Sequence, residues 1–432
     1  MRIPRLFATA LATTLLLTVA APVASAAARP AAAPAASSAP DPAALGRALG
    51  AVHDAGMYGI YSSVRDGADR WAGASGVADV DTGRPARPDL RQRIGSISKT
   101  FAAVAVLQQV ERGRIRLDAP IGDYLPDLIP GERGREITVR MLLDHTSGIG
   151  DFVLSAFPSL EQGSAASLDE DRFRAVAPEE LVRLGLAARA TGRPGEKWSY
   201  SNTNYVIAGL LLAKVTGQDP EAYITRHVID RAGLRHTSYP RSAYIEGPHA
   251  RMYESFYGLI DPPRDYSVYD MSWAYTAGAV VSTTDDLNRF YRALLGGRLV
   301  GPDALRQMRT TVPAGGGMNY GLGIYSVDVP GCGRFWGHDG VVFGAGTIAL
   351  SSPDGSRQVA AGWNLTKYER LDSAGTGFEP SPIDDALNRY VVTALCPSAT
   401  PASERAATTS LRRILTGTGT DLSPAPWAAV LR

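Results

Sequence analysis

The feature that most constrains the fold is an apolar run directly behind a short polar turn. The turn is Arg93-Ile94-Gly95-Ser96-Ile97-Ser98-Lys99-Thr100, and residues 101–110 then carry only Phe, Ala, Val and Leu besides two glutamines. This pattern predicts a buried helix that ends at Gly113. The apolar content of the chain, 45%, is enough to build the large cores that such a helix needs.

Two residues of this turn carry possible chemistry. Ser96 and Lys99 are three apart, so they meet across one helical turn. A serine hydroxyl is a weak nucleophile until a base removes its proton, and a lysine can be that base if burial keeps it neutral. The helix N-terminus also offers unpaired N–H groups where an oxyanion would form.

The alternative is an N-cap serine followed by an ordinary surface lysine. The chain has 44 Lys+Arg, of which only Lys99, Lys197, Lys214 and Lys367 are lysines. Because arginine cannot be deprotonated, a lysine at this position in an arginine-rich chain favours a base.

The ends of the chain have the composition of segments outside a folded domain. Residues 1–26 have two arginines, an apolar stretch and Ala24-Ser25-Ala26, which is the pattern of a secretory signal peptide. Residues 27–40 are expected to be a disordered leader and residues 397–432 a loose tail. We therefore expect a secreted, extracellular protein without a membrane span after signal removal.

Between these ends the pattern predicts one mixed α/β domain over residues 41–396. Sheet halves are expected at about 41–116 and 285–396, on either side of a mostly helical insert at about 117–284. The individual predictions are helices at 41–53, 203–215 and 382–395, with Asn202 as an N-cap, and strands at 59–64, 70–80, 320–327, 333–337, 345–351 and 358–363.

The chain has two cysteines, Cys332 and Cys396, and both would remain after signal removal. In an exported protein one disulfide is the simple expectation, with two unpaired buried thiols as the alternative.

Two further motifs are weak when taken alone. Tyr200-Ser201-Asn202 places a tyrosine and an asparagine two residues apart, so in an extended loop both reach one pocket. A tyrosine near a lysine can shuttle a proton, whereas the alternative is a surface tyrosine beside a helix cap. His338-Asp339-Gly340-Val341 lies on a predicted strand, where Gly340 would let a substrate approach and the Val341 N–H could donate to an oxyanion; the alternative is an ordinary strand end.

Together, in the order S-x-x-K, Y-x-N and H-x-G, the motifs resemble the penicillin-recognising serine hydrolases. The similarity is greatest to the class C β-lactamase and serine D-alanyl-D-alanine carboxypeptidase branch, and residues 142–149 and 282–287 also resemble that branch. The resemblance covers residues 41–396. It implies a β-lactamase/transpeptidase-like α/β fold, with an antiparallel sheet flanked by helices and an inserted helical domain.

The resemblance also implies roles for the site residues. Ser96 would be the acylated nucleophile, Lys99 its base and Tyr200 the proton donor to the leaving group. Asn202, His338, Asp339, Gly340 and Val341 would bind substrate, and the backbone N–H groups of Ser96 and Val341 would form the oxyanion hole. The expected protein is a monomer that hydrolyses peptidoglycan stem peptides or β-lactams without metal or cofactor.

One residue departs from the family pattern. Carboxypeptidases of this branch often have threonine where this chain has Asp339, and a carboxylate there would repel the carboxylate of a peptide substrate. Adjacent strand residues face opposite sides, so Asp339 lies either in the pocket or behind it. The leading expectation is a D-alanyl-D-alanine carboxypeptidase. An esterase or β-lactamase, and a penicillin or peptidoglycan binder without turnover, are the alternatives.

Overall fold

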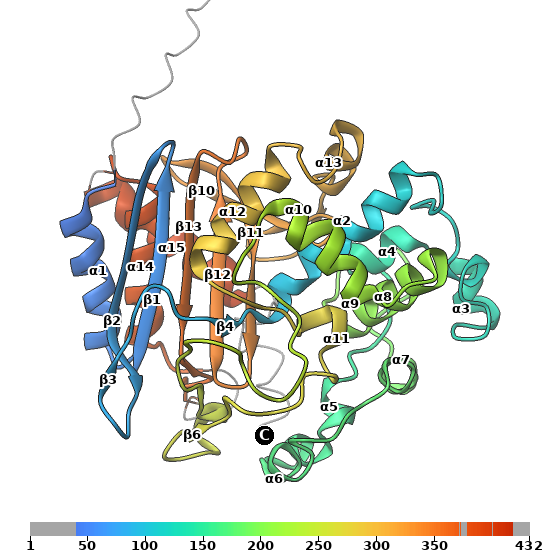
Figure 1. Ribbon diagram of the computed structural model, residues 1–432, viewed down its shortest axis with the longest axis horizontal. Helices are drawn as coiled ribbons and strands as arrows, with labels where there is room; N and C mark the ends of the chain where they lie inside the picture. Colours follow the sequence, from blue (N-terminus) through green and yellow to red (C-terminus); the bar gives the residue numbers. More distant parts are fainter. Residues whose placement is uncertain (1–39, 371, 373–377, 400, 418–432) are drawn as a thin grey trace, which may run out of the picture. The chain divides into compact units, whose positions relative to one another are not determined.

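A nine-stranded antiparallel sheet forms the centre of the described part of the chain (Figure 1). The structure is a computed structural model that describes residues 40–370, 372, 378–399 and 401–417. The strand order is β3-β2-β1-β13-β12-β11-β10-β9-β8. The strands are β1 (Gly59–Asp66), β2 (Asp69–Asp79), β3 (Arg84–Pro85), β8 (Val312–Pro313), β9 (Asn319–Tyr320), β10 (Tyr325–Val329), β11 (Gly333–Val342), β12 (Ala345–Ser351) and β13 (Arg357–Trp363).

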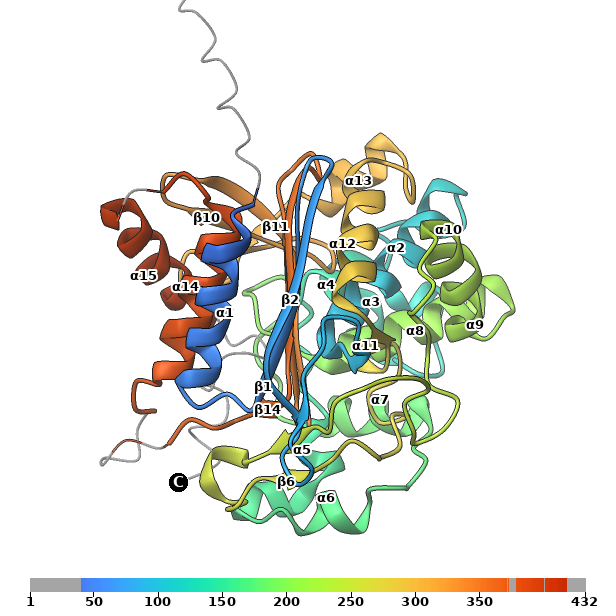
Figure 2. The same cartoon turned by 60° about the vertical axis from the view of Figure 1, so that its left-hand side comes forward.

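Helices cover both faces of this sheet. Figure 2 shows α1 (Pro42–Asp54), α14 (Pro382–Leu395) and α15 (Pro401–Gly417) on one side, and α12 (Thr284–Leu295) with α2 (Ser98–Glu111) on the other. Because both faces are covered, the central strands are buried at nearly every position. Thus Ile348 and Leu350 of β12 enter the core under α1 and α14, whereas Ala349 enters the core that contains α2.

The second core belongs to a mostly helical region between β4 (Gln92–Arg93) and α12. The buried helix α2 runs through it, as predicted, with every side chain from Ser98 to Gln109 buried. The other helices outside the large sheet are α3 (Gly131–Glu136), α4 (Val139–Leu143), α5 (Val153–Ala156), α6 (Ala166–Glu170), α7 (Pro178–Ala187), α8 (Asn202–Thr216), α9 (Pro220–Ile224), α10 (Asp230–Ala232), α11 (Tyr275–Gly278) and α13 (Pro302–Met308). The short strands outside that sheet are β5 (Tyr253–Glu254), β6 (Arg264–Asp265), β7 (Val281–Ser282) and β14 (Leu365–Thr366). The short turns are the 3₁₀ turns η1 (Gly95–Ile97), η2 (Ile121–Asp123), η3 (Pro158–Gln162) and η5 (Phe256–Gly258) and the π-helical turn η4 (Thr225–Ile229).

The predicted α/β fold with its flanking helices is confirmed, and two local predictions need correction. The strand expected at 320–327 is divided, because residues 321–324 separate β9 from β10. The loose tail expected after residue 396 instead contains α15, whose Ala407 and Leu411 are buried beside α14 and β10. Alanine-rich composition suggested disorder there, but alanine is also the best helix former.

Cys332 and Cys396 form the predicted disulfide, with Cα atoms 5.6 Å apart. The bond joins the loop between β10 and β11 to the end of α14. The predicted signal peptide, residues 1–26, lies outside the described residues, as do residues 27–39 and 418–432. None of the described helices is both long and apolar enough to cross a membrane.

Candidate active site

Ser96 lies on η1, the turn that leads into α2, and strand β11 packs directly against this turn. Gly95 has φ +52°, and a Cβ there would lie 2.8 Å from the Val341 nitrogen. A Cβ on Gly340 would lie 2.6 Å from the Ser96 nitrogen. Glycine is therefore required on both segments, and this close approach brings the backbone nitrogens of Ser96 and Val341 to one site.

The register of β11 explains why its end is available to the turn. Residues 333–337 pair with β10, whereas residues 338–342 pair only with β12 within the described chain. The edge of β11 beyond Gly337 is thus without a neighbouring strand, and η1 packs along it.

Lys99 brings the first two motifs together. Its Nζ is hydrogen-bonded to Ser96 Oγ, lies 2.7 Å from Asn202 Oδ1 and 2.9 Å from the carbonyl oxygen of Ala277. A carbonyl oxygen can only accept, so these two oxygens take two N–H donors. A neutral amine has two such donors, and its lone pair would then face Ser96 Oγ, as a base requires.

Asn202 holds its amide in the orientation that this geometry needs. Its side-chain nitrogen donates to Asp151 Oδ2 at 2.8 Å, and its backbone N–H donates to the same oxygen at 2.7 Å. The amide oxygen is thereby turned toward Lys99. The predicted N-cap role is wrong, because Ser201 is the N-cap of α8 and Asn202 is its first residue.

Tyr200 also lies beside the lysine. The Lys99 amine is 4.9 Å from the centre of the Tyr200 ring, and the His145 ring lies 4.3 Å from that ring on another side. His145 Nδ1 accepts from the backbone N–H of Ser201 at 3.2 Å, and burial lowers the pKa of His145 well below its usual value. His145 is thus a neutral ring that packs against the Tyr200 ring.

His338, the first residue of the third motif, is fully buried. Its Nδ1 donates to the Asp339 carbonyl oxygen at 2.5 Å, and its Nε2 is 2.8 Å from the Tyr320 hydroxyl. Burial lowers the pKa of His338 to about 3, although the carbonyl contact opposes the shift. The ring is therefore neutral at physiological pH and supplies no positive charge to a substrate.

Asp339 is also fully buried. It lies near Tyr325 and Tyr291, where burial raises the pKa of Tyr325 and the Asp339 charge adds to the shift. Neither His338 nor Asp339 lines the pocket beside Ser96. Of the two positions left open by the sequence, Asp339 thus occupies the one behind the pocket.

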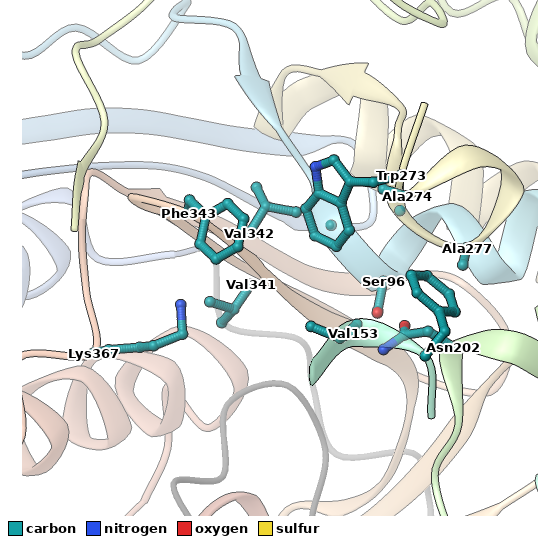
Figure 3. A pocket seen from close by; sticks show the side chains of 13 residues that line it. Ser96, Val153, Asn202, Trp273, Ala274, Ala277, Val341, Val342, Phe343 and Lys367 are labelled. Atoms are coloured by element: carbon teal, nitrogen blue, oxygen red, sulfur yellow. The ribbon is translucent and has the colours of Figure 1, made fainter. Parts of the chain in front are cut away.

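A pocket opens beside Ser96 (Figure 3). Its lining is mainly apolar, with Ser96 and Asn202 at one side and a lysine at another: Gly95, Ser96, Phe152, Val153, Asn202, Trp273, Ala274, Ala277, Gly278, Val341, Val342, Phe343 and Lys367. Within the described residues no group of three or more His, Cys, Asp or Glu side chains could hold a metal ion.

The sequence did not reveal Asp151, the Ala277 carbonyl or most of the pocket lining. Asp151 and Ala277 act through contacts with residues far away in the sequence, which no local pattern reveals. Lys367 had a signal, since it is one of four lysines in the chain.

A serine and a buried lysine on one helical turn, packed against the edge of an antiparallel sheet, define a serine hydrolase of the β-lactamase fold. The Beta-lactamase family model matches residues 47–376, and the chain belongs to this family.

Similar proteins include several hydrolases. The structure of a D-stereospecific amidohydrolase from a Streptomyces species has 34% sequence identity, with a TM-score of 0.71, over 83% of this chain and 100% of that chain. Esterase EstB of Burkholderia gladioli is 35% identical over 165 residues, 38% of this chain and 42% of that protein. PbpX of Bacillus subtilis (strain 168) is 27% identical over 234 residues, 54% of this chain and 52% of that protein. The chain thus spans about half the length of these curated relatives.

Proposed function

We propose that the protein hydrolyses amide bonds on the carboxyl side of D-configured residues through an acyl-enzyme on Ser96. The D-alanyl-D-alanine end of peptidoglycan stem peptides is the leading substrate. The observation that carries the proposal is the Lys99 amine, which is held between Ser96 Oγ, Asn202 Oδ1 and the Ala277 carbonyl oxygen. The similarity to the D-stereospecific amidohydrolase supports the choice of D-residues.

In the acylation step, neutral Lys99 takes the Ser96 hydroxyl proton while Oγ bonds to the substrate carbonyl carbon. The Ser96 and Val341 N–H groups stabilise the negative oxygen that forms. When the C–N bond breaks, the proton passes from Lys99 through Tyr200 to the leaving amine. The acyl group then remains on Ser96 as an ester.

In the deacylation step, a water molecule attacks this ester and gives up a proton to the Tyr200–Lys99 pair. The oxyanion again lies against the Ser96 and Val341 N–H groups, and Ser96 Oγ leaves with the proton that the pair returns. The products are a carboxylic acid and the regenerated enzyme.

The position of Asp339 supports a peptide substrate. Because the Asp339 side chain is fully buried, its carboxylate is not exposed to the terminal carboxylate of a bound peptide. We also propose export, on the basis of the signal-like residues 1–26; Edman sequencing of protein collected from the culture medium should begin after Ala26.

The shared mechanism is tested by intact-mass measurement with a fluorescent penicillin. The wild type should gain one adduct, and Ser96→Ala should gain none. Ser155→Ala is the matched control, since Ser155 is an exposed serine on α5 close to the pocket, and it should label like wild type. Labelling of Ser96→Ala, or no labelling of wild type, would contradict the acyl-enzyme mechanism.

Substrate class is tested by comparing kcat/KM for an Nα-acyl-D-Ala-D-Ala peptide, its L-Ala-D-Ala counterpart and a short-chain ester. We expect the D-Ala-D-Ala peptide to exceed the L-Ala-D-Ala peptide by at least a hundredfold. An ester preferred over both peptides would favour the second candidate, an esterase, which the similarity to Esterase EstB supports. An adduct without turnover of any substrate would indicate a penicillin binder.

A further inference from the structure

The pocket has a cation at the end away from the nucleophile. Figure 3 shows Lys367 on the opposite side of the pocket from Ser96, with Val341 and Phe343 between them. The Lys367 amine lies 5.2 Å from the ring centre of Phe343 and 5.4 Å from that of Phe256. Only 8% of the lysine side chain is exposed, so its charge is largely removed from bulk water.

The partner of this lysine, Glu254, also has other hydrogen-bond donors. Lys367 Nζ lies 2.7 Å from Glu254 Oε2, and the Glu254 side chain is fully buried. The Glu254 carboxylate also accepts from Phe256 N–H at 2.8 Å, Thr366 Oγ1 at 2.9 Å and Gly344 N–H at 3.3 Å. Three other donors thus stabilise the Glu254 carboxylate. Lys367 is therefore not its only hydrogen-bond partner, and neutralising Glu254 need not be the only role of this lysine.

The lysine keeps hydrogen-bonding capacity toward the pocket. An ammonium group has three N–H donors, and among the described residues only Glu254 accepts from this one. Two donors therefore remain for a ligand that enters the pocket.

The backbone at Lys367 is held in an unusual conformation. Its φ is +49°, in the left-handed region that non-glycine residues rarely adopt. The Tyr257 N–H donates to the Lys367 carbonyl oxygen at 2.6 Å, which fixes this conformation. Strained residues of this kind are typical of functional sites, and here the strained residue is the one that carries its side chain into the pocket.

The pocket accommodates one side of the substrate. Its lining includes Ser96, Asn202 and Val341 but not Tyr200, the proposed proton donor to the leaving group. On the proposed function, the group that occupies it is therefore the acyl part of the substrate. Its far end meets Lys367.

We propose that Lys367 binds a carboxylate on the acyl side of the substrate, so that the enzyme selects acyl groups with a remote negative charge. This inference rests on the proposed function for the assignment of the acyl side. A carboxylate would accept the two remaining N–H donors of Lys367, and the apolar walls around the amine would strengthen the pairing.

The test measures binding separately from turnover. Isothermal titration calorimetry on Ser96→Ala protein would use Nα-succinyl-, glutaryl-, adipyl- and suberyl-D-alanine p-nitroanilides, each paired with its ω-carboxamide analogue. We expect the carboxylate form to bind at least tenfold more tightly at the best chain length. In Ser96→Ala/Lys367→Met protein this preference should fall below twofold, while carboxamide binding changes less than threefold.

A second variant controls for the effect of breaking the Lys367–Glu254 ion pair. Removing Lys367 alone leaves the Glu254 charge buried, so Lys367→Met with Glu254→Gln keeps the site neutral and of similar volume. The same loss of preference is expected in this variant. Equal binding of the two series in the parent protein, no binding of either series, or an unchanged preference in both variants would overturn the proposal. Turnover of the carboxamide series by wild-type protein tests the proposed function independently.

Discussion

At the scale of single residues, the site depends on the order in which side chains fix one another. Asp151 orients Asn202, Asn202 accepts from Lys99, and Lys99 contacts Ser96. Asp151 is thus linked to Ser96 through two other side chains, Asn202 and Lys99.

We therefore predict that Asp151→Asn slows acylation. One oxygen of the Asp151 carboxylate accepts from Asn202, and the other accepts from the Val153 N–H at 2.8 Å. An asparagine at this position has an NH₂ group in place of one of these oxygens, so one of the two contacts must be lost. The acylation rate with fluorescent penicillin should fall at least tenfold, about 1.4 kcal/mol. The double variant with Asn202→Ala should be no slower than Asn202→Ala alone, because both act through Lys99. Additive losses would show that Asp151 acts independently.

The neutral histidines predict how stability depends on pH. Burial lowers the pKa of His338 to about 3, whereas the ring titrates near 6.5 in the unfolded chain. Between these values the unfolded state binds more protons, so the free energy of unfolding rises with pH. The contribution of His338 to stability is therefore lost as the pH falls from about 6.5 toward about 3. His145, whose pKa burial also lowers, contributes in the same direction.

His338→Asn should reduce this slope by about 1.4 kcal/mol per pH unit between roughly pH 4 and 5.5, as measured by urea unfolding. The control is His236→Asn, which removes an exposed imidazole instead of a buried one. An unchanged slope in His338→Asn would mean that the ring is protonated in the folded protein.

At the scale of elements, α15 is the unexpected feature. It packs against α14 and β10, and its Leu411 is 1% exposed in the core on that face of the sheet. The helix thereby covers apolar surface that would otherwise meet water.

Leu411→Ala should lower the free energy of unfolding by about 2–4 kcal/mol, the usual effect of removing a buried leucine. Ala406→Ser, on the exposed side of the same helix, should change it by less than about 0.5 kcal/mol. Chemical denaturation of the two variants measures both values. If Leu411→Ala behaved like its control, α15 would not be part of the folded core.

At the scale of the whole molecule, the disulfide joins the end of α14 to the loop between β10 and β11. It closes a loop with a sequence separation of 64 residues. In the chain-entropy model such a loop stabilises the folded state by about 4 kcal/mol.

Cys332→Ser/Cys396→Ser should lose stability of this order and should still acylate with penicillin at 25 °C, since neither cysteine lines the pocket. Thermal unfolding and the penicillin adduct measure the two properties on one sample. Loss of the adduct in a variant that is still folded at 25 °C would show that the bond also shapes the site.

Much of the fold was predictable because its signals are local. Turn residues, alternating or continuous apolar runs and helix ends located β1, β2, β12, β13, α2 and α14 to within a few residues. The Ser96–Lys99 contact was predictable for the same reason, since three residues of helical geometry determine it. The division of β9 from β10 and the helical α15 were missed, because composition there fits more than one conformation.

The remaining parts of the site were decided only by tertiary structure. Asp151, the Ala277 carbonyl and Lys367 reach the pocket or its lysine from segments far apart in the sequence, and packing alone brings them together. The sequence by itself located the Ser96–Lys99 turn and identified the family. It left open whether Asp339 faces the pocket, because alternation along a strand fixes only that neighbours face opposite sides. The tertiary structure decided this by burying Asp339 near Tyr325 and Tyr291, since which face of β11 meets the pocket depends on where η1 packs.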